Sequence, residues 1–209
     1  MPASAKLLVF LSAALLLAIA PGPGMLYVLS RSLAGGRREG ILSALGTFGG
    51  GMVHVVAAAA GISLILAQSA LAFATVKYAG AAYLCFLGVR MLVGADSGND
   101  LPQAAESGSG RPFWQGIATE VLNPKTALFF LSFIPQFVDH RGGHVFAQFV
   151  ALGTISVILN TSADLVVIML AGPLGERIRS SVTFRRRQRK LTGFIMIGLG
   201  TYLAASDSR

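Results

Sequence analysis

Two short stretches place helix-breaking and polar residues inside otherwise apolar sequence. The first, APGPGM, holds Pro21, Gly22, Pro23 and Gly24. Proline removes a backbone hydrogen bond and clashes with the preceding helical turn, so this stretch predicts a break in a helix. A broken helix offers free carbonyl groups at one end and free amide groups at the other, which can hold a cation and an anion respectively.

The second stretch, EVLNPK, brings Glu120, Asn123, Pro124 and Lys125 together. Pro124 lies about 11 residues into an apolar segment, so about 16 Å deep and near the middle of a bilayer. Breaks at corresponding places in two halves of a membrane protein indicate a substrate site. An amino acid carries both an ammonium and a carboxylate group, so it suits a paired break. Prolines that merely kink packed helices are the alternative.

Asp164 adds a second acidic group within an apolar segment, in the sequence LNTSADLVV. Ionisable residues inside spans are costly unless they face water or the protein interior. Burial disfavours a charged carboxyl group, whereas an approaching substrate ammonium favours it, so substrate binding expels a proton. We therefore expect Asp164 and Glu120 to be the proton-coupling residues. Pairing of Asp164 with Lys125, or of Glu120 with Lys125 after reorientation by the break, remains open.

His54 and Asn160 complete the candidate substrate-binding set, which otherwise comprises the two broken stretches. His54 follows Gly46 and Gly50 at successive intervals of four, and small residues at this spacing also allow close helix packing. His140 and His144 have no carboxylate or cysteine cluster around them, so we expect no metal site there.

The composition determines the protein class. Of 209 residues, 54% are hydrophobic and only 12% are charged, and the mean hydropathy is +0.67, whereas a soluble domain carries about 25% charged residues. A polytopic membrane protein is indicated. A lone cysteine, Cys85, excludes an intrachain disulfide and a CxxC redox pair. No HExxH motif is present, so a membrane-embedded enzyme is disfavoured, and a passive channel remains the other alternative.

Six apolar segments approach the length of about 20 residues that a membrane helix needs. They cover residues 7–29, 41–67, 71–93, 113–138, 145–171 and 191–205. Only QSA separates the second from the third, which predicts a tight antiparallel pair. The stretch 94–112 is rich in Gly, Ser and Asp and predicts a cytoplasmic linker between two halves, 1–93 and 113–209.

Lysine and arginine are enriched in the odd-numbered loops, above all in the run RRRQRK. This asymmetry predicts that these loops are cytoplasmic and that both termini are periplasmic. The basic run is therefore interpreted as an orientation signal and not as a nucleic-acid contact, although an anionic-lipid contact is a weaker alternative. The N-terminal segment resembles a signal peptide, but we expect it to be retained because apolar sequence resumes after PGPG.

The two halves resemble each other. Phe10 precedes Pro21 by the same interval that separates Phe113 from Pro124, and KYAG opens the third segment as KLTG opens the sixth. We therefore expect an all-α membrane protein of six transmembrane helices, arranged as two inverted three-helix repeats with helices 1 and 4 broken. An odd number of helices in each repeat forces opposite orientations, as in many secondary transporters.

Three regions resemble the signatures of the LysE/RhtB family of amino-acid exporters. They are APGPGMLYVLSRSLAGGRREGI, KYAGAAYLCFLGVRML and FWQGIATEVLNPKTALFFLSFIPQFV. The resemblance implies a bacterial inner-membrane protein that exports amino acids or related metabolites by proton antiport, without a cofactor. We expect contact with membrane lipids, and the sequence leaves open whether the protein forms a homo-oligomer. It implies motif roles for Pro21, Gly22, Pro23, Asn123, Pro124 and Lys125, and packing roles for Gly80, Tyr83 and Gly88. Glu120 departs from the family pattern, in which a neutral residue is common.

Overall fold

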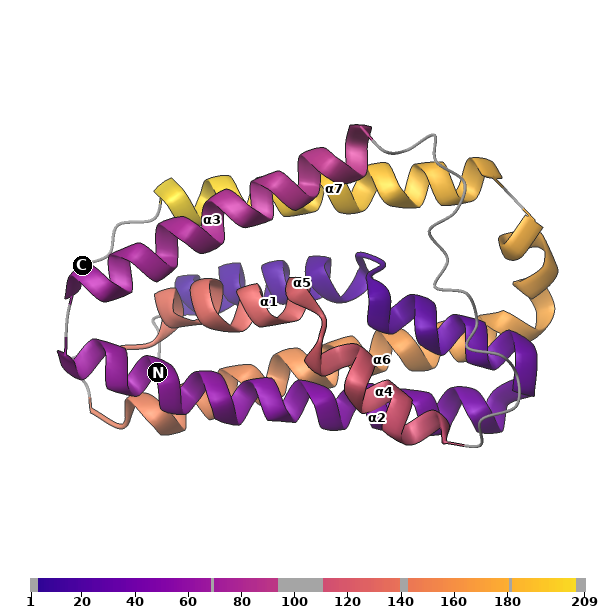
Figure 1. The fold of residues 1–209 in the computed structure, drawn as a ribbon, viewed down its shortest axis with the longest axis horizontal. Coiled ribbons are helices and arrows are strands. Elements are labelled where there is room, and N and C mark those ends of the chain that lie inside the picture. The colour runs from indigo at the N-terminus through magenta and orange to yellow at the C-terminus, as the bar shows by residue number, and fades with distance from the viewer. Residues whose placement is uncertain (1–3, 69, 94–110, 140–142, 181, 206–209) are drawn as a thin grey trace.

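The computed structural model describes residues 4–68, 70–93, 111–139, 143–180 and 182–205, and these residues are predominantly helical (Figure 1). The elements are α1 (Ser4–Ile19), α2 (Pro23–Gln68), α3 (Ala70–Val93), α4 (Pro112–Val121), α5 (Pro124–Leu128), the π-helical turn η2 (Phe129–Phe133), the 3₁₀ turn η3 (Ile134–Phe137), α6 (Val145–Ser180) and α7 (Val182–Ala205). The expected all-α class is therefore confirmed for this part of the chain. The predicted linker lies outside the described residues, apart from its last two.

The chain of α2 reverses direction at Gly36. This glycine has φ 71° and ψ −169°, a conformation that residues with a side chain rarely adopt. Arg31 Nη1 lies 3.3 Å from Glu39 Oε2, although eight residues of continuous helix span about 12 Å. The two parts of α2 are thus antiparallel, as the sequence predicted by assigning them to separate apolar segments.

The apolar helices fit a membrane in length and composition. Among the described residues, three helical stretches are long and apolar enough to cross a bilayer, at Pro23–Gly61, Ala74–Val93 and Val145–Ala171. The pair Pro112–Val121 and Pro124–Phe137, bent by 47°, passes the same test as one broken span, and Lys6–Ile19 is a shorter apolar helix. The first turns of α7 contain the basic run, and α7 is not among these candidates.

Two groups of helices form the body. The second part of α2 packs along α4 and α6, while α3 packs along α7 (Figure 1). The predicted tight pairing of α2 with α3 is therefore wrong, although only residue 69 separates them. Glycines determine the partner, because a Cβ atom at Gly88 would lie 2.6 Å from the Gly193 carbonyl oxygen. Only glycine at these positions lets α3 and α7 approach so closely.

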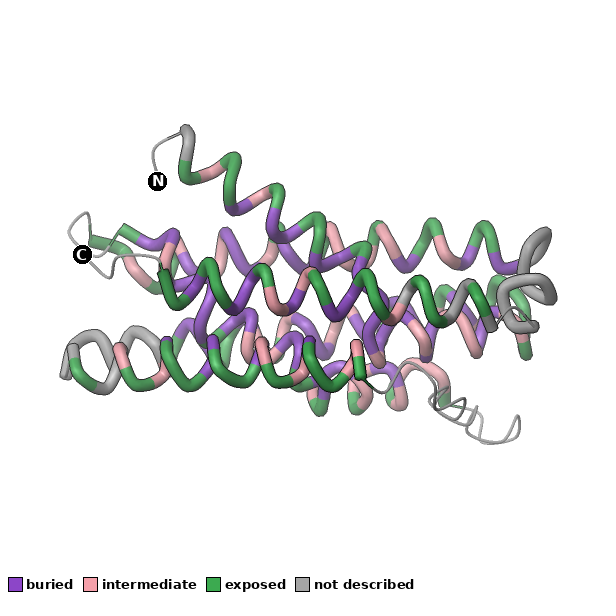
Figure 2. The backbone as a smooth tube through the Cα atoms, turned by 90° about the horizontal axis from the view of Figure 1, so that it is seen from above, coloured by how far each residue is buried: buried purple, intermediate pink, exposed green. Residues whose placement is uncertain are grey.

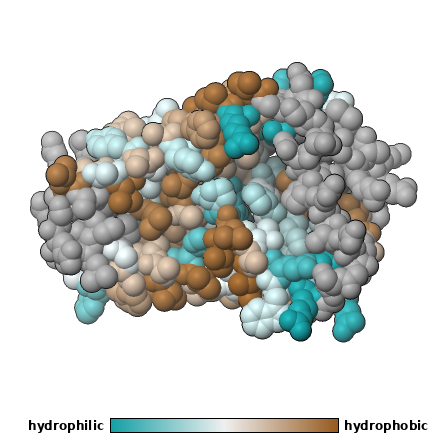
Figure 3. Space-filling view, in the orientation of Figure 1, coloured by the Kyte–Doolittle hydropathy of each residue, from teal (hydrophilic) through white to brown (hydrophobic). Residues whose placement is uncertain are grey.

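Buried and exposed residues alternate along the helices, so each helix has an inner and an outer face (Figure 2). The inner faces enclose an aromatic core that includes Phe10, Phe129, Phe133 and Phe137. The outer faces are also largely apolar, with exposed side chains such as Leu16, Leu45, Val56, Met169 and Phe194. In Figure 3, apolar residues spread over the visible face and strongly hydrophilic ones lie mostly in its right half. An apolar exterior of this kind is expected where lipid is the solvent.

The basic run after the fifth apolar segment is helical and not a loop. We expected the sixth helix to begin at residue 191, but α7 begins at Val182, only two residues after the end of α6. Arginine, lysine and glutamine are good helix formers, so charge alone does not interrupt a helix. The first residues of α1 and the last residues of α7 lie toward the same end of the elongated molecule (Figures 1 and 2).

Candidate functional site

The predicted break in the first apolar segment is present between Ile19, the last residue of α1, and Pro23, the first of α2. In an uninterrupted helix the amide of residue 21 would bond to the carbonyl of Leu17, but Pro21 has no amide hydrogen. The side chain of Lys125 replaces this donor. Its Nζ donates to the carbonyl oxygens of Leu17, at 3.1 Å, and Ala20, at 2.8 Å.

Lys125 is positioned by the second break. Asn123 caps α5, where its side chain accepts a hydrogen bond of 3.1 Å from the backbone amide of Lys125. The Lys125 side chain is only 5% exposed. It passes Gly22, where an added Cβ would lie 3.1 Å from Cε and Nζ. A lysine of the fourth segment thus closes the carboxyl end of α1, where the helix dipole favours a positive charge.

Glu120 makes the complementary contact from the last turn of α4. Its carboxylate accepts hydrogen bonds from Thr126 Oγ1 at 2.6 Å and from Asn123 Nδ2 at 3.2 Å. It also lies against Gly24, where any side chain would collide with Oε2. Gly24 belongs to the first turn of α2, whose free amides and partial positive charge favour an anion.

The second broken segment therefore places one charged side chain at each helix end of the first. Lys125 of the second break satisfies the carboxyl end of α1, and Glu120 lies at the amino end of α2. Within the described residues no salt bridge joins Lys125 to Glu120 or to Asp164. Both pairings left open by the sequence are thus absent, because each charge has a helix end or neutral side chains as its partner.

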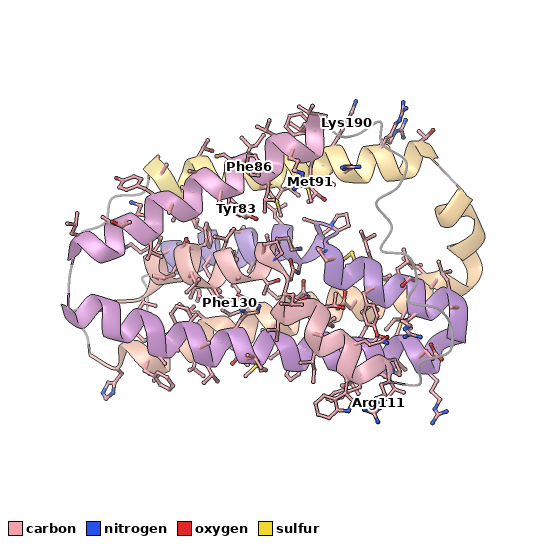
Figure 4. The ribbon with its side chains drawn as sticks, in the orientation of Figure 1. Tyr83, Phe86, Met91, Arg111, Phe130 and Lys190 are labelled. Carbon is pink, nitrogen blue, oxygen red and sulfur yellow. The ribbon has the colours of Figure 1, made fainter. Side chains whose placement is uncertain are left out.

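His54 lies on the predicted glycine face of α2. A Cβ at Gly50 would lie 2.7 Å from Glu120 Cβ, and one at Gly46 would collide with the Phe113 carbonyl oxygen. This face packs against α4. His54 Nε2 lies 3.0 Å from the Glu120 carbonyl oxygen, and its ring stacks on Phe130 with centroids 6.1 Å apart. The side chain labelled Phe130 lies between α5 and α2 in Figure 4.

Asp164 is fully buried on α6. Thr47 Oγ1 donates to its Oδ2 at 3.2 Å, while its Oδ1 has no hydrogen-bond partner among the described residues. A buried carboxyl oxygen without a partner is costly when the group is charged. The environment of Asp164 therefore suits a group that takes up and releases a proton.

A small cavity lies between the two breaks. Its lining includes three sequence-predicted residues, Glu120, Lys125 and Asn160, together with the apolar side chains of Leu17 and Phe130. The cavity volume is about 20 Å³, which is enough for about one water molecule. His54 and Asp164 are adjacent to this region but do not line the cavity.

Further contacts tie the halves of the broken segments together. On the Gly36 side of the breaks, Tyr27 Oη donates to the Pro112 carbonyl oxygen at 2.7 Å, and Arg31 donates to Gln115 Oε1. On the other side, the rings of Phe10 and Phe137 pack with centroids 5.4 Å apart. The first part of α2 is thus fastened to α4, and α1 to η3.

Sequence reasoning missed several polar and aromatic residues of the site. Thr47, Thr126, Ser156 and Phe129 all line the cavity. The available signals were the position of Thr47 within GTFGGG and that of Thr126 directly after NPK. The expected packing position Tyr83 is instead 40% exposed beside Phe86.

Comparison with known proteins identifies the family that this chain resembles. The model of the LysE type translocator family matches residues 15–207. An uncharacterized membrane protein of Vibrio cholerae is 32% identical over 207 residues, covering 96% of this chain and 97% of the relative. A homoserine/homoserine lactone efflux protein of Salmonella typhimurium is 29% identical over 201 residues, covering 94% and 95% respectively. No solved structure matches the chain.

Proposed function

Because the chain belongs to the LysE type translocator family, which makes it a transporter and not an enzyme, we propose that it exports amino acids or related small metabolites from the bacterial cytoplasm in exchange for protons. The Salmonella relative, named for efflux of homoserine and homoserine lactone, supports a small polar substrate of this class. Asp164 and Glu120 are the proposed proton carriers.

The main support for this proposal is that the oppositely charged Lys125 and Glu120 line one cavity, each beside a helix end of the first break. An ammonium group has three N–H donors, and Lys125 uses two of them on the carbonyls of Leu17 and Ala20. The third donor is available to a substrate carboxylate. Each carboxylate oxygen of Glu120 accepts one hydrogen bond and has capacity for another, which suits a substrate ammonium.

The cavity lining combines polar and apolar side chains. Thr47, Ser156 and Asn160 contribute polar groups, whereas Leu17 and Phe130 contribute apolar surface. This combination supports a substrate whose amino and carboxylate groups are charged and whose side chain is small. A cavity with room for about one water is too small for an amino acid, so the helices have to move apart when substrate enters.

Purified protein in lipid vesicles provides the direct test. We expect labelled amino acids from a panel of homoserine, threonine, lysine and leucine to move against their concentration gradient when a proton gradient is imposed. For at least one member, collapse of the gradient should stop net transport while one-for-one exchange continues. Transport that only follows the amino-acid gradient, at an unchanged rate after collapse, would identify a passive channel and overturn the proposed antiport.

We also propose six spans in two inverted repeats, with periplasmic termini. The packing of α3 along α7 and of α2 along α6 supports this arrangement, because each pair joins corresponding elements of the two halves. A reporter active only in the periplasm should be active when fused after Arg209 and silent when inserted after Leu101. The opposite pattern in expressed protein would contradict the orientation.

A further inference from the structure

Three buried oxygens near the proposed proton carrier have no hydrogen-bond partner among the described residues. They are Asp164 Oδ1, Thr161 Oγ1 and Ser43 Oγ. Native proteins rarely bury polar atoms without partners, and each exception calls for a functional or chemical explanation. Two of the three are hydroxyl oxygens, one belongs to a carboxyl group, and they lie on two helices that pack together.

The packing of α2 on α6 brings the stretches that contain these atoms opposite each other. Gly40 approaches Ile168, and Gly51 approaches Val157, because an added Cβ would lie 3.0 Å from Ile168 Cγ1 in the first case and 3.0 Å from Val157 Cγ2 in the second. The two helices are therefore antiparallel, and residues 43 and 47 face residues 161 and 164. The hydrogen bond from Thr47 to Asp164 confirms this register.

Helical spacing brings the hydroxyl groups to the faces that meet. Ser43 precedes Thr47 by four residues, and Thr161 precedes Asp164 by three, so each pair shares one face of its helix. Ser43 is fully buried. A hydroxyl oxygen can accept a hydrogen bond from the protonated form of a carboxyl group.

We propose that Ser43 and Thr161 complete a proton-binding pocket around Asp164, so that the two hydroxyl groups set the pH at which the site loads. This inference rests on the proposed proton-coupled export. When Oδ1 takes up a proton, the Ser43 or Thr161 side chain rotates toward it, and its hydroxyl oxygen accepts a hydrogen bond from the new O–H group, while Thr47 continues to donate to Oδ2. Release of the proton reverses these steps.

Other groups act on the same carboxyl. Glu120 of α4 and Lys125 of α5 are charged residues that line the neighbouring cavity, and a negative charge opposes the charged form of a nearby carboxyl group whereas a positive charge favours it. The Thr47 hydroxyl group of α2 donates a hydrogen bond to the Asp164 carboxyl group. Because Ser43 and Thr161 are neutral, their removal changes the proton site without changing these charges. The proposed role is therefore separable from general electrostatics.

The test uses the vesicle assay with the panel amino acid that shows the largest proton-driven export. Ser43→Ala and Thr161→Val should move the pH of half-maximal proton-driven export to more acidic values by up to about one unit, because a lost hydrogen bond weakens proton binding by up to about tenfold. Exchange without a proton gradient should continue. Thr161→Ser, which keeps a hydroxyl group, should restore the original pH profile.

Ser162→Ala is the matched control, since Ser162 lies beside Thr161 but donates to the Ile158 carbonyl oxygen on the exposed side of α6. It should leave the profile unchanged. Unaltered profiles for both Ser43→Ala and Thr161→Val would overturn the proposed pocket. Dependence of wild-type transport on sodium in place of protons would also overturn it, whereas absence of coupled transport in the wild type would instead refute the proposed function.

Discussion

Lys125→Met should lower export about 100-fold while the protein still inserts into the membrane. Methionine approximates the shape of lysine but has no donor, so the substrate carboxylate loses its proposed partner, and the carbonyls of Leu17 and Ala20 lose theirs. A hydrogen bond to a charged group contributes about 1.5–3 kcal/mol, and about 2.7 kcal/mol corresponds to 100-fold. Export and inserted protein should be measured together. Lys190→Met, an exposed lysine of α7, is the control.

A second change separates the structural from the transport role of Lys125. Pro21→Ala returns an amide that can bond to the Leu17 carbonyl. Added to Lys125→Met, it should therefore recover part of the lost thermal stability but not the export. If the Lys125→Met variant exports at the wild-type rate, or if the double variant exports normally, Lys125 does not bind substrate.

Asp164→Asn should abolish proton-driven accumulation of substrate in vesicles while exchange of substrate across the membrane survives. Asparagine keeps the size and an acceptor for Thr47, but it does not take up or release a proton. Exchange by this variant should also lose its dependence on pH. Full proton-driven transport by Asp164→Asn would eliminate Asp164 as the carrier, and Glu120→Gln would then be measured in the same assay. Asp139→Asn, at an exposed position near the end of η3, is the control.

The helix breaks were predictable because their cause is local. Pro21 and Pro124 lack amide hydrogens wherever the chain places them, so the sequence alone marks where helical bonding stops. The packing face of Gly46 and Gly50 was predictable for a similar reason, since side-chain size and helical spacing are both visible in the sequence. These features locate the site along the chain.

The partners across the site were not predictable. Lys125 bonds to residues 105 and 108 positions earlier, and no local pattern specifies such a contact. The sequence offered the carboxylate of Glu120 or Asp164 as its partner, and the structure shows the chain's own carbonyls. The same holds for Asp164, whose donor Thr47 lies 117 positions earlier.

Charge was a poor guide to secondary structure. The basic run was interpreted as a loop, yet α7 begins at Val182 and includes all of it. Arg31 was assigned to the same class of loop residues, but it is buried and bonds to Glu39 and Gln115. Orientation rules depend on where charges lie relative to lipid and say little about which residues they contact.

The pairing of half-helices on either side of the breaks determines how the molecule can open. Tyr27 and Arg31 fasten the first part of α2 to α4, while Phe10 and Phe137 fasten α1 to η3. We expect each pair to move as one unit, and the two units meet where proline has already removed helical hydrogen bonds. A tilt of one unit against the other therefore breaks few additional backbone hydrogen bonds. We expect the two pairs of half-helices to rotate relative to each other about the two breaks, without unwinding of any helix.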